Sequence, residues 1–146
     1  MKKLIFMGIM LFGLSAFSQN TNNLFDKYIS VKNALVKSDS KAAGTAIAAL
    51  NEAVKNEAAF AQKEELLKAI EKLNKANNLE KQRDSFNEVS TQMWKLVKTS
   101  NKVNQAVYYQ YCPMKKAYWL SKEKDIKNPY YGSSMLSCGK VAETKK

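Results

Sequence analysis

From Asn22 to Ser100 the chain contains no proline and only one glycine, Gly44. Alanine, leucine, lysine and glutamate, which favour helices, make up much of this stretch. Proline and glycine are the residues that most readily interrupt a helix. A long stretch that contains only a single glycine and no proline therefore favours helices joined by short links. The sequence therefore predicts a mainly α fold for this part of the chain.

Apolar residues recur at helical spacing, three, four or seven positions apart, in four segments of this stretch. They are Leu24, Tyr28, Val31 and Leu35; Ala43, Ile47, Leu50 and Val54; Leu66, Ile70 and Leu73; and Leu79, Phe86, Val89, Met93 and Leu96. The first segment stops at Ser38-Asp39-Ser40, which favour helix N-caps. Residues 56–62 contain no glycine or proline, so 41–76 forms either one kinked helix or two. We expect an antiparallel bundle of three to four helices over about 22–100.

After Asn101 the composition changes. Seven of the 15 aromatic residues lie between 107 and 131, and both prolines and both cysteines lie between 112 and 139. The alternating side chains of 103–111 predict a short strand, and 117–120 and 140–141 are candidates for further strand pieces. We expect a small irregular or β cap over about 101–146 that joins the bundle in one domain, residues 19–146. The side chains expected to seal this cap onto the bundle are Tyr109, Tyr111, Trp119 and Tyr130.

The first 18 residues have the pattern of a secretory signal peptide. Lys2 and Lys3 precede an apolar run over 4–14, and small residues stand at Ala16 and Ser18 before the expected cut. The apolar run is too short to span a bilayer stably. We therefore predict an exported protein, periplasmic or secreted, with no transmembrane segment after cleavage.

The charge and the absence of histidine exclude several functions. The chain has 24 lysines and arginines against 13 acidic residues, a formal charge of +11, and no histidine. All but one of the basic residues are lysine, which lacks the planar fork of arginine, so we expect a dispersed basic surface and no nucleic-acid binding. Catalysis and metal binding by histidine are impossible. No carboxylate pair or phosphate-binding loop suggests an enzyme.

Each cysteine has a methionine close by in the sequence. Met114 follows Cys112 by two residues, and Met135 precedes Cys138 by three. Thiolate and thioether are soft donors, which select Cu(I) or Ag(I) over harder ions. Folding could bring the two pairs around one ion, and the neighbouring lysines, at 115, 116 and 140, are expected to lower the thiol pKa.

The spacing leaves a second interpretation open. Two cysteines in an exported protein commonly form a structural disulfide, and Cys112 and Cys138 would close a loop of 26 residues. On the chain-entropy estimate, that crosslink stabilises the fold by roughly 3–4 kcal/mol. The protein would then bind no metal, and the methionines would fill gaps in the cap. The cysteines could also remain free buried thiols.

The C-terminal motifs resemble a bacterial extracytoplasmic domain family of unknown function. The resemblance rests on Tyr111-Cys112-Pro113-Met114, Trp119-Leu120-Ser121, Asn128-Pro129-Tyr130-Tyr131-Gly132, Met135-Leu136 and Cys138-Gly139-Lys140-Val141. Upstream it includes Tyr28, Ala34-Leu35, Asp39, Ala42-Ala43, Arg83 and Phe86, and so covers roughly 24–141. That family occurs as standalone secreted proteins and at the C-terminus of copper and silver efflux adaptors. The first motif also resembles short heavy-metal-binding modules with Cys-Pro-Met-His, but Lys115 replaces their histidine.

The resemblance implies a periplasmic protein that binds a soft metal, or a metallochaperone-like protein associated with heavy-metal efflux. Its metal ligands would be Cys112, Met114, Met135 and Cys138. The partner would be a periplasmic efflux adaptor or another envelope protein. The alternative is a disulfide-stapled helical protein-interaction domain of the cell envelope, without metal.

Overall fold

The structure, a computed structural model, describes residues 20–146, so the predicted signal peptide lies outside the described residues. Four helices come first: α1 (Thr21–Val36), α2 (Ser40–Asn56), α3 (Lys63–Asn74) and α4 (Leu79–Thr99). They are followed by β1 (Val107–Cys112), β2 (Ala117–Ser121), the short 3-10 helix η1 (Gly132–Ser134) and β3 (Lys140–Lys145). This confirms a mainly α bundle with a small C-terminal β cap.

Side-chain caps explain where several helices begin and end. Asp39 accepts a hydrogen bond from the Ala42 N–H at the start of α2, and Asn78 accepts one from Lys81 at the start of α4, each at 2.9 Å. The open question about residues 41–76 is resolved as two helices. The Lys63 ammonium reaches back to the Lys55 carbonyl, 3.0 Å away, and so satisfies a free carbonyl at the end of α2.

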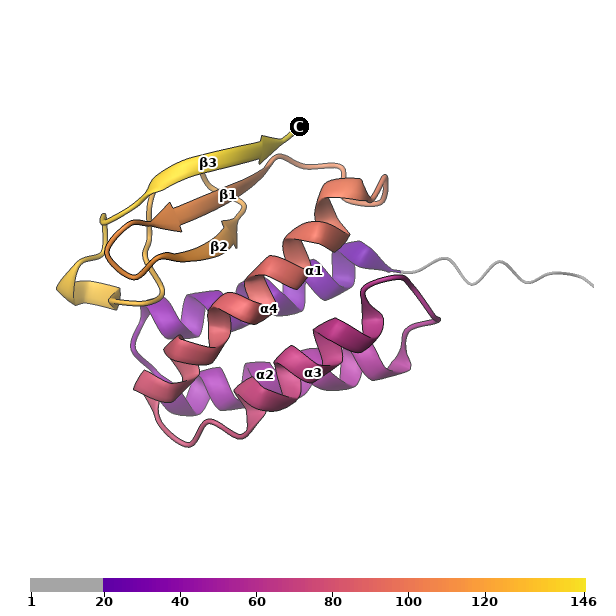
Figure 1. Ribbon diagram of the computed structural model, residues 1–146, viewed down its shortest axis with the longest axis horizontal. Coiled ribbons are helices and arrows are strands. Elements are labelled where there is room, and N and C mark those ends of the chain that lie inside the picture. The colour runs from indigo at the N-terminus through magenta and orange to yellow at the C-terminus, as the bar shows by residue number, and fades with distance from the viewer. Residues whose placement is uncertain (1–19) are drawn as a thin grey trace, which may run out of the picture.

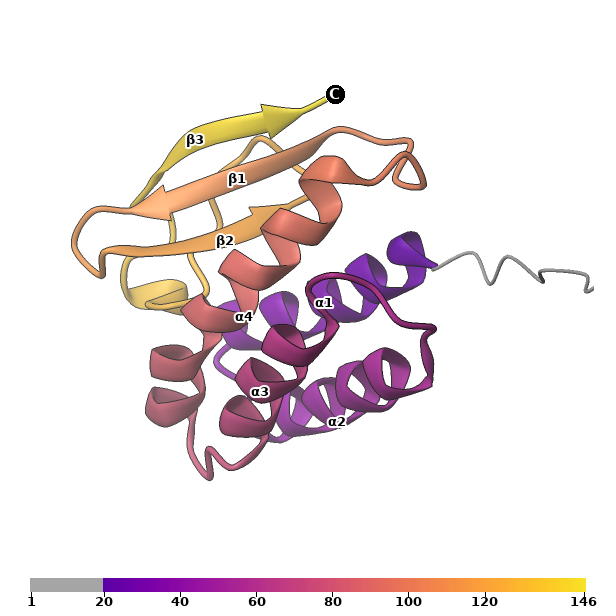
Figure 2. The same ribbon diagram turned by 45° about the vertical axis from the view of Figure 1, so that its right-hand side comes forward.

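The elements form three layers (Figures 1 and 2). Consecutive helices run in opposite directions; α2 and α3 form the outer layer, and α1 and α4 lie between them and the sheet. The antiparallel sheet has the order β2-β1-β3. In residues 20–146 no helix combines the length and the apolar character that a membrane crossing requires.

The first strand begins later than the alternation of 103–111 predicts. Val107 pairs with Lys145, which is the last residue of β3, so residues before Val107 have no partner strand. Val103 is nevertheless buried, and its carbonyl accepts a hydrogen bond from the Lys145 ammonium at 2.8 Å. The expected strand pieces at 117–120 and 140–141 are confirmed as parts of β2 and β3.

The outer edge of β2 is attached to the helices by side chains. The Tyr118 N–H donates to Asn87 Oδ1 on α4 at 2.8 Å, and the Leu120 N–H donates to the Tyr28 hydroxyl on α1 at 3.0 Å. The Ser90 hydroxyl donates to the Phe86 carbonyl, so the Tyr28 hydroxyl must donate its own proton to Ser90 Oγ, 2.7 Å away. These bonds pair backbone N–H groups on the edge strand β2 that would otherwise have no partner, and they fix the cap on the bundle.

Aromatic side chains fill the contact between cap and bundle, as predicted. Trp119, Tyr130 and Tyr109 are buried, whereas Tyr111 is half-buried. Tyr109 stacks on Trp94 of α4 with ring centroids 4.7 Å apart. Such pairs stabilise the contact beyond their buried area by about 0.5–1.5 kcal/mol.

Lys32 of α1 is a buried charge, with 4% of its surface exposed and no hydrogen bond or ion pair to any described residue. Burial lowers its pKa, although the nearby Glu123 partly opposes this. We expect Lys32→Met to raise the free energy of unfolding at pH 7 by about 1 kcal/mol, because removing an unpaired buried charge removes its desolvation cost.

The effect of Lys32 on stability has a defined pH dependence. Its pKa is lower in the folded state, so the unfolded state binds more protons and the wild type gains stability as the pH rises. The wild type is therefore less stable than Lys32→Met by the full amount at pH values below the pKa of Lys32 in the folded state. This difference in the free energy of unfolding disappears as the pH approaches the pKa of lysine in the unfolded state, about 10.4. Urea unfolding at pH 7 and pH 10 measures this, with the exposed Lys37→Met as control. Equal stability of the Lys32 variant and the wild type at pH 7 would contradict it.

Candidate metal centre

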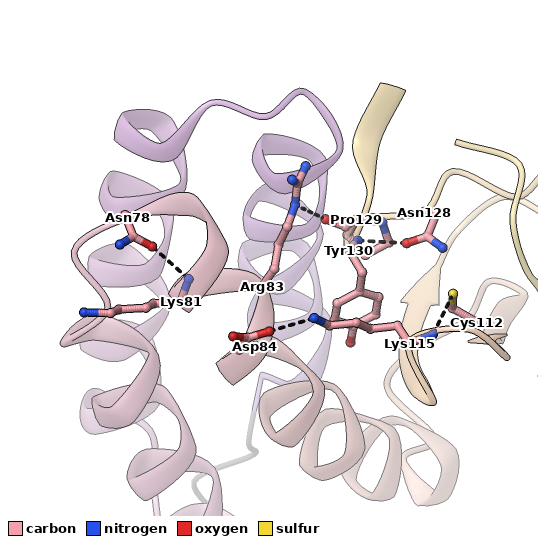
Figure 3. A network of polar contacts seen from close by, with 9 residues as sticks. All are labelled: Asn78, Lys81, Arg83, Asp84, Cys112, Lys115, Asn128, Pro129 and Tyr130. Atoms are coloured by element: carbon pink, nitrogen blue, oxygen red, sulfur yellow. Dashed lines mark hydrogen bonds and ion pairs between the residues drawn. The ribbon is translucent and has the colours of Figure 1, made fainter. Parts of the chain in front are cut away.

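Cys112 is the last residue of β1, and its side chain is fully buried. The turn that follows leads to β2 and has Lys116 in the left-handed region, with φ of 52°. The Lys115 N–H donates to Cys112 Sγ at 3.4 Å, while the Lys115 ammonium pairs with Asp84 of α4 at 2.7 Å (Figure 3). These contacts hold the turn, and with it the Cys112 thiol, against the bundle.

The pairing of β1 with β3 brings Cys138 to Cys112. Tyr111 pairs with Lys140, so one further position along each strand places Cys112 across from Gly139, the neighbour of Cys138. Gly139 has φ of 152°, and a Cβ there would lie 2.8 Å from Trp119 Cη2 and 3.0 Å from the Tyr111 carbonyl. Only glycine therefore lets the chain pass close enough to Trp119 to approach β1 in this register.

Asn128 organises the loop that carries Cys138, a role that the sequence analysis missed. It is fully buried, and its N–H and Nδ2 donate to the carbonyls of Leu136 and Cys138 at 2.8 and 2.7 Å. Its Oδ1 accepts the Tyr130 N–H at 2.8 Å (Figure 3). In the sequence Asn128 stands before Pro129, in one of the motifs that carry the family resemblance, which indicates a turn but not the burial of Asn128.

Arg83 of α4 connects this loop to the bundle. Its Nε donates to the Pro129 carbonyl at 2.8 Å, and its Nη2 donates to the Leu35 carbonyl at 2.9 Å and to Ser38 Oγ at 3.0 Å (Figure 3 shows the first of these bonds). Leu35 lies in the last turn of α1. One side chain therefore joins α1, α4 and the loop that leads to Cys138.

The structure brings the two predicted cysteine ligands together. Cys112 Sγ and Cys138 Sγ lie 3.8 Å apart, and both cysteines are free thiols. Met114 lies on the turn after β1 with 65% of its surface exposed. Met135 is half-buried, and its carbonyl accepts the Cys138 N–H at 3.1 Å in a tight turn. That Met114 and Met135 are ligands stays a prediction.

The expected effect of the lysines on the thiols is wrong for Cys138. Its pKa is raised, first by partial removal from water and then by its hydrogen bond and charge interaction with Cys112. The Lys115 ammonium pairs with Asp84, and its contact with sulfur is through the backbone N–H. At neutral pH the Cys138 thiol is therefore protonated, and any metal that it binds must displace a proton.

Within residues 20–146 no group of three or more cysteine, aspartate or glutamate side chains is placed to hold a metal ion. Structural zinc sites generally use four such ligands, or histidine. The thiol pair instead suits two reactions, which are binding a soft ion with further sulfur donors and closing a disulfide.

Comparison with known proteins yields a family match that covers the helical part of the chain but not the thiol pair. No significant match to a curated protein or to a solved structure was found. One family model matches residues 24–105, which include α2, α3, α4 and all of α1 except its first three residues. The match ends before Cys112, so neither the sulfur motifs nor the efflux association enters it. Because the match covers more than half of the chain, the protein belongs to DUF3347, a family of proteins of unknown function.

Proposed function

We propose that the protein binds one soft monovalent ion, Cu(I) or Ag(I), between the thiolates of Cys112 and Cys138. The observation that carries this proposal is the 3.8 Å separation of two free sulfurs contributed by different segments of the cap. With a metal–sulfur distance of about 2.3 Å, these sulfurs subtend an angle of about 110° at the ion. That angle suits three or four ligands, so the ion keeps room for another donor.

The methionines are the natural further donors within the chain. Met135 is joined to Cys138 through the turn hydrogen bond, and Met114 lies two residues beyond Cys112. A thioether from either one would give the all-sulfur ligand set that Cu(I) and Ag(I) favour. The lysines of the cap would balance the net negative charge of two thiolates around a monovalent ion.

The setting that we propose is outside the cytoplasm, in the periplasm or the secreted fraction. The signal-peptide pattern supports export, and the resemblance to a domain of copper and silver efflux adaptors supports a metallochaperone-like role. The protein would sequester the ion and pass it to an efflux adaptor or another envelope protein. The same sulfur separation also favours the second candidate, a disulfide-stapled interaction domain without metal.

Competition titration of the reduced protein with Cu(I) or Ag(I) tests the proposal. We expect one ion per chain, and a loss of affinity of at least about 100-fold, or about 2.7 kcal/mol, in Cys112→Ser and in Cys138→Ser. Met135→Leu and Met114→Leu are expected to cost about tenfold or less, because one donor can replace the other. Met93→Leu, a change in the buried core of α4, is the matched control.

The titration should also depend on pH. Because the ion displaces thiol protons and the pKa of Cys138 is raised, apparent affinity should increase with pH through the neutral range and beyond. Reduced protein that has two titratable thiols but binds neither ion contradicts the proposal. So does binding that both cysteine variants retain in full.

A further inference from the structure

The two segments that carry the thiols, although Cys112 itself is buried, also carry exposed apolar side chains. We call residues 112–116 and 135–140 the thiol face; their segments lie at the same end of the molecule in Figures 1 and 2. Among the described residues, the large apolar side chains that are exposed are Met114, at 65%, and Leu136, at 40%. Each lies two residues from a thiol cysteine. Isolated exposed apolar residues need no explanation, but here both flank one site.

The charge of the cap differs from that of the bundle. Residues 101–146 contain nine lysines against three acidic residues, whereas residues 20–100 contain 13 basic and ten acidic residues. On the thiol face Lys116 and Lys140 are exposed and have no ion-pair partner in the described part of the chain. A basic rim of this kind attracts a partner with carboxylates and disfavours a basic one.

An ion bound by the two thiolates would have at least one coordination position left for another ligand. Two thiolates at the observed separation leave a soft ion short of its usual three or four ligands, and the exposed Met114 lies two residues beyond Cys112. A ligand exchange that passes the ion onward needs an incoming soft donor.

We infer that the thiol face is a docking surface for a protein segment that carries methionine or cysteine between carboxylate side chains. Apolar contact with Met114 and Leu136 holds the segment, and Lys116 and Lys140 face its acidic residues. This inference rests on the proposed function, since the methionine or cysteine of the docking segment has a role only if the protein passes its bound ion to that segment. A membrane surface fits the thiol face less well than a protein segment does. Two apolar side chains insert only weakly into a bilayer, and lipids carry no soft donor for the ion.

Two synthetic peptides of equal length test the docking surface. One carries a single methionine between pairs of aspartates, and the other has lysines in place of the aspartates. NMR titration of the reduced, metal-free protein should show shifts in the amides of 112–116 and 135–140 with the acidic peptide. We expect it to bind at least about fivefold more tightly than the basic peptide at low salt, with most of the difference lost at high salt.

Variants and a loaded form complete the test. Lys116→Glu/Lys140→Glu should reverse the preference between the peptides. The control pair Lys68→Glu on α3 and Lys75→Glu at its C-cap makes the same change in net charge and should leave the preference unchanged. Met114→Ser/Leu136→Ser should weaken binding of the acidic peptide severalfold. With silver-loaded protein, the acidic peptide should remove the ion faster than the basic one.

The outcomes separate this inference from the proposed function. Silver bound by the thiols without any preference between the peptides overturns the docking surface and leaves the metal site standing. Acidic peptide bound at the thiol face of a protein that binds no silver supports the surface and ends the metal proposal. The docking surface is also overturned if the NMR chemical-shift changes are confined to another face. Binding to vesicles containing phosphatidylserine, with no binding of either peptide, would overturn it as well.

Discussion

Oxidation of the reduced protein is expected to join Cys112 to Cys138 and to raise the free energy of unfolding by about 3–4 kcal/mol. The sulfurs lie 3.8 Å apart, so side-chain rotation with small backbone shifts can bring them to the bonding distance of about 2.05 Å. The crosslink closes a loop of 26 residues that includes β2 and the loop organised by Asn128. Its main effect is to restrict the unfolded chain, in which these segments would otherwise separate.

Denaturant unfolding of the oxidised and reduced forms measures this stabilisation, and Cys138→Ser is the control that should not respond to the oxidant. Disulfide formation requires a thiolate, and the pKa of Cys138 is raised, so oxidation should be slow at neutral pH and faster in mildly alkaline buffer. Equal stability of the two forms, with the bond verified by mass, would contradict the expected stabilisation.

The same experiment separates the two candidate functions. A disulfide sulfur cannot bind an ion as a thiolate, so oxidised protein should bind no silver, and reduction should restore binding if the metal proposal is correct. Protein that is purified oxidised, resists reduction and binds no silver once reduced would instead support the disulfide-stapled interaction domain. The thiol pair therefore has two mutually exclusive chemical states, and only one of them can carry a metal.

The helices could be predicted because their apolar spacing and N-caps are local properties. Asp39, in the stretch expected to favour N-caps, is the N-cap of α2 in the structure. The separation of α2 from α3 could not be predicted, since residues 56–62 contain no helix breaker. That break is stabilised by the Lys63 side chain, which caps the end of α2 from outside the helix.

The candidate site was predicted in part, from residue chemistry alone. The rarity of cysteine in the chain was enough to single out Cys112 and Cys138. Their proximity depends on the β1–β3 register and on the close passage of Gly139 over Trp119, both of which are set by tertiary packing. The exposure of Met114 and the burial of Asn128 also depend on packing, because neither follows from residue type.

Replacing Arg83 by methionine is expected to lower the free energy of unfolding by about 2–4 kcal/mol. Arg83 is the one arginine of the chain, and its half-buried guanidinium has no carboxylate partner among the described residues. Its three bonds run to the Leu35 carbonyl of α1, to the Ser38 hydroxyl just after α1 and to the Pro129 carbonyl. Methionine keeps much of the side-chain volume but leaves these acceptors without a donor. A hydrogen bond to a charged group contributes about 1.5–3 kcal/mol net, and the loss here is smaller than three such bonds because the half-buried site lets water reach some of the acceptors.

The geometry at Gly132 shows how tightly this junction is packed. Gly132 has φ of 57°, and a Cβ there would lie 2.7 Å from both Arg83 Nη2 and Ser38 Oγ. Lysine at position 83 keeps the charge but lacks the planar fork, so it cannot reach the Pro129 and Leu35 carbonyls at once. We therefore expect Arg83→Lys to recover only a minor part of the loss.

Urea unfolding of Arg83→Met and Arg83→Lys measures these effects, with the exposed neighbour Lys81→Met on α4 as control (Figure 3). The control should change stability by less than about 0.5 kcal/mol. Because Arg83 holds the loop that leads to Cys138, silver affinity should fall in Arg83→Met under conditions in which the variant is still folded. An Arg83→Met protein as stable as the Lys81→Met control would mean that water satisfies both carbonyls, and that the loop carrying Cys138 is held by Asn128 without help from α4.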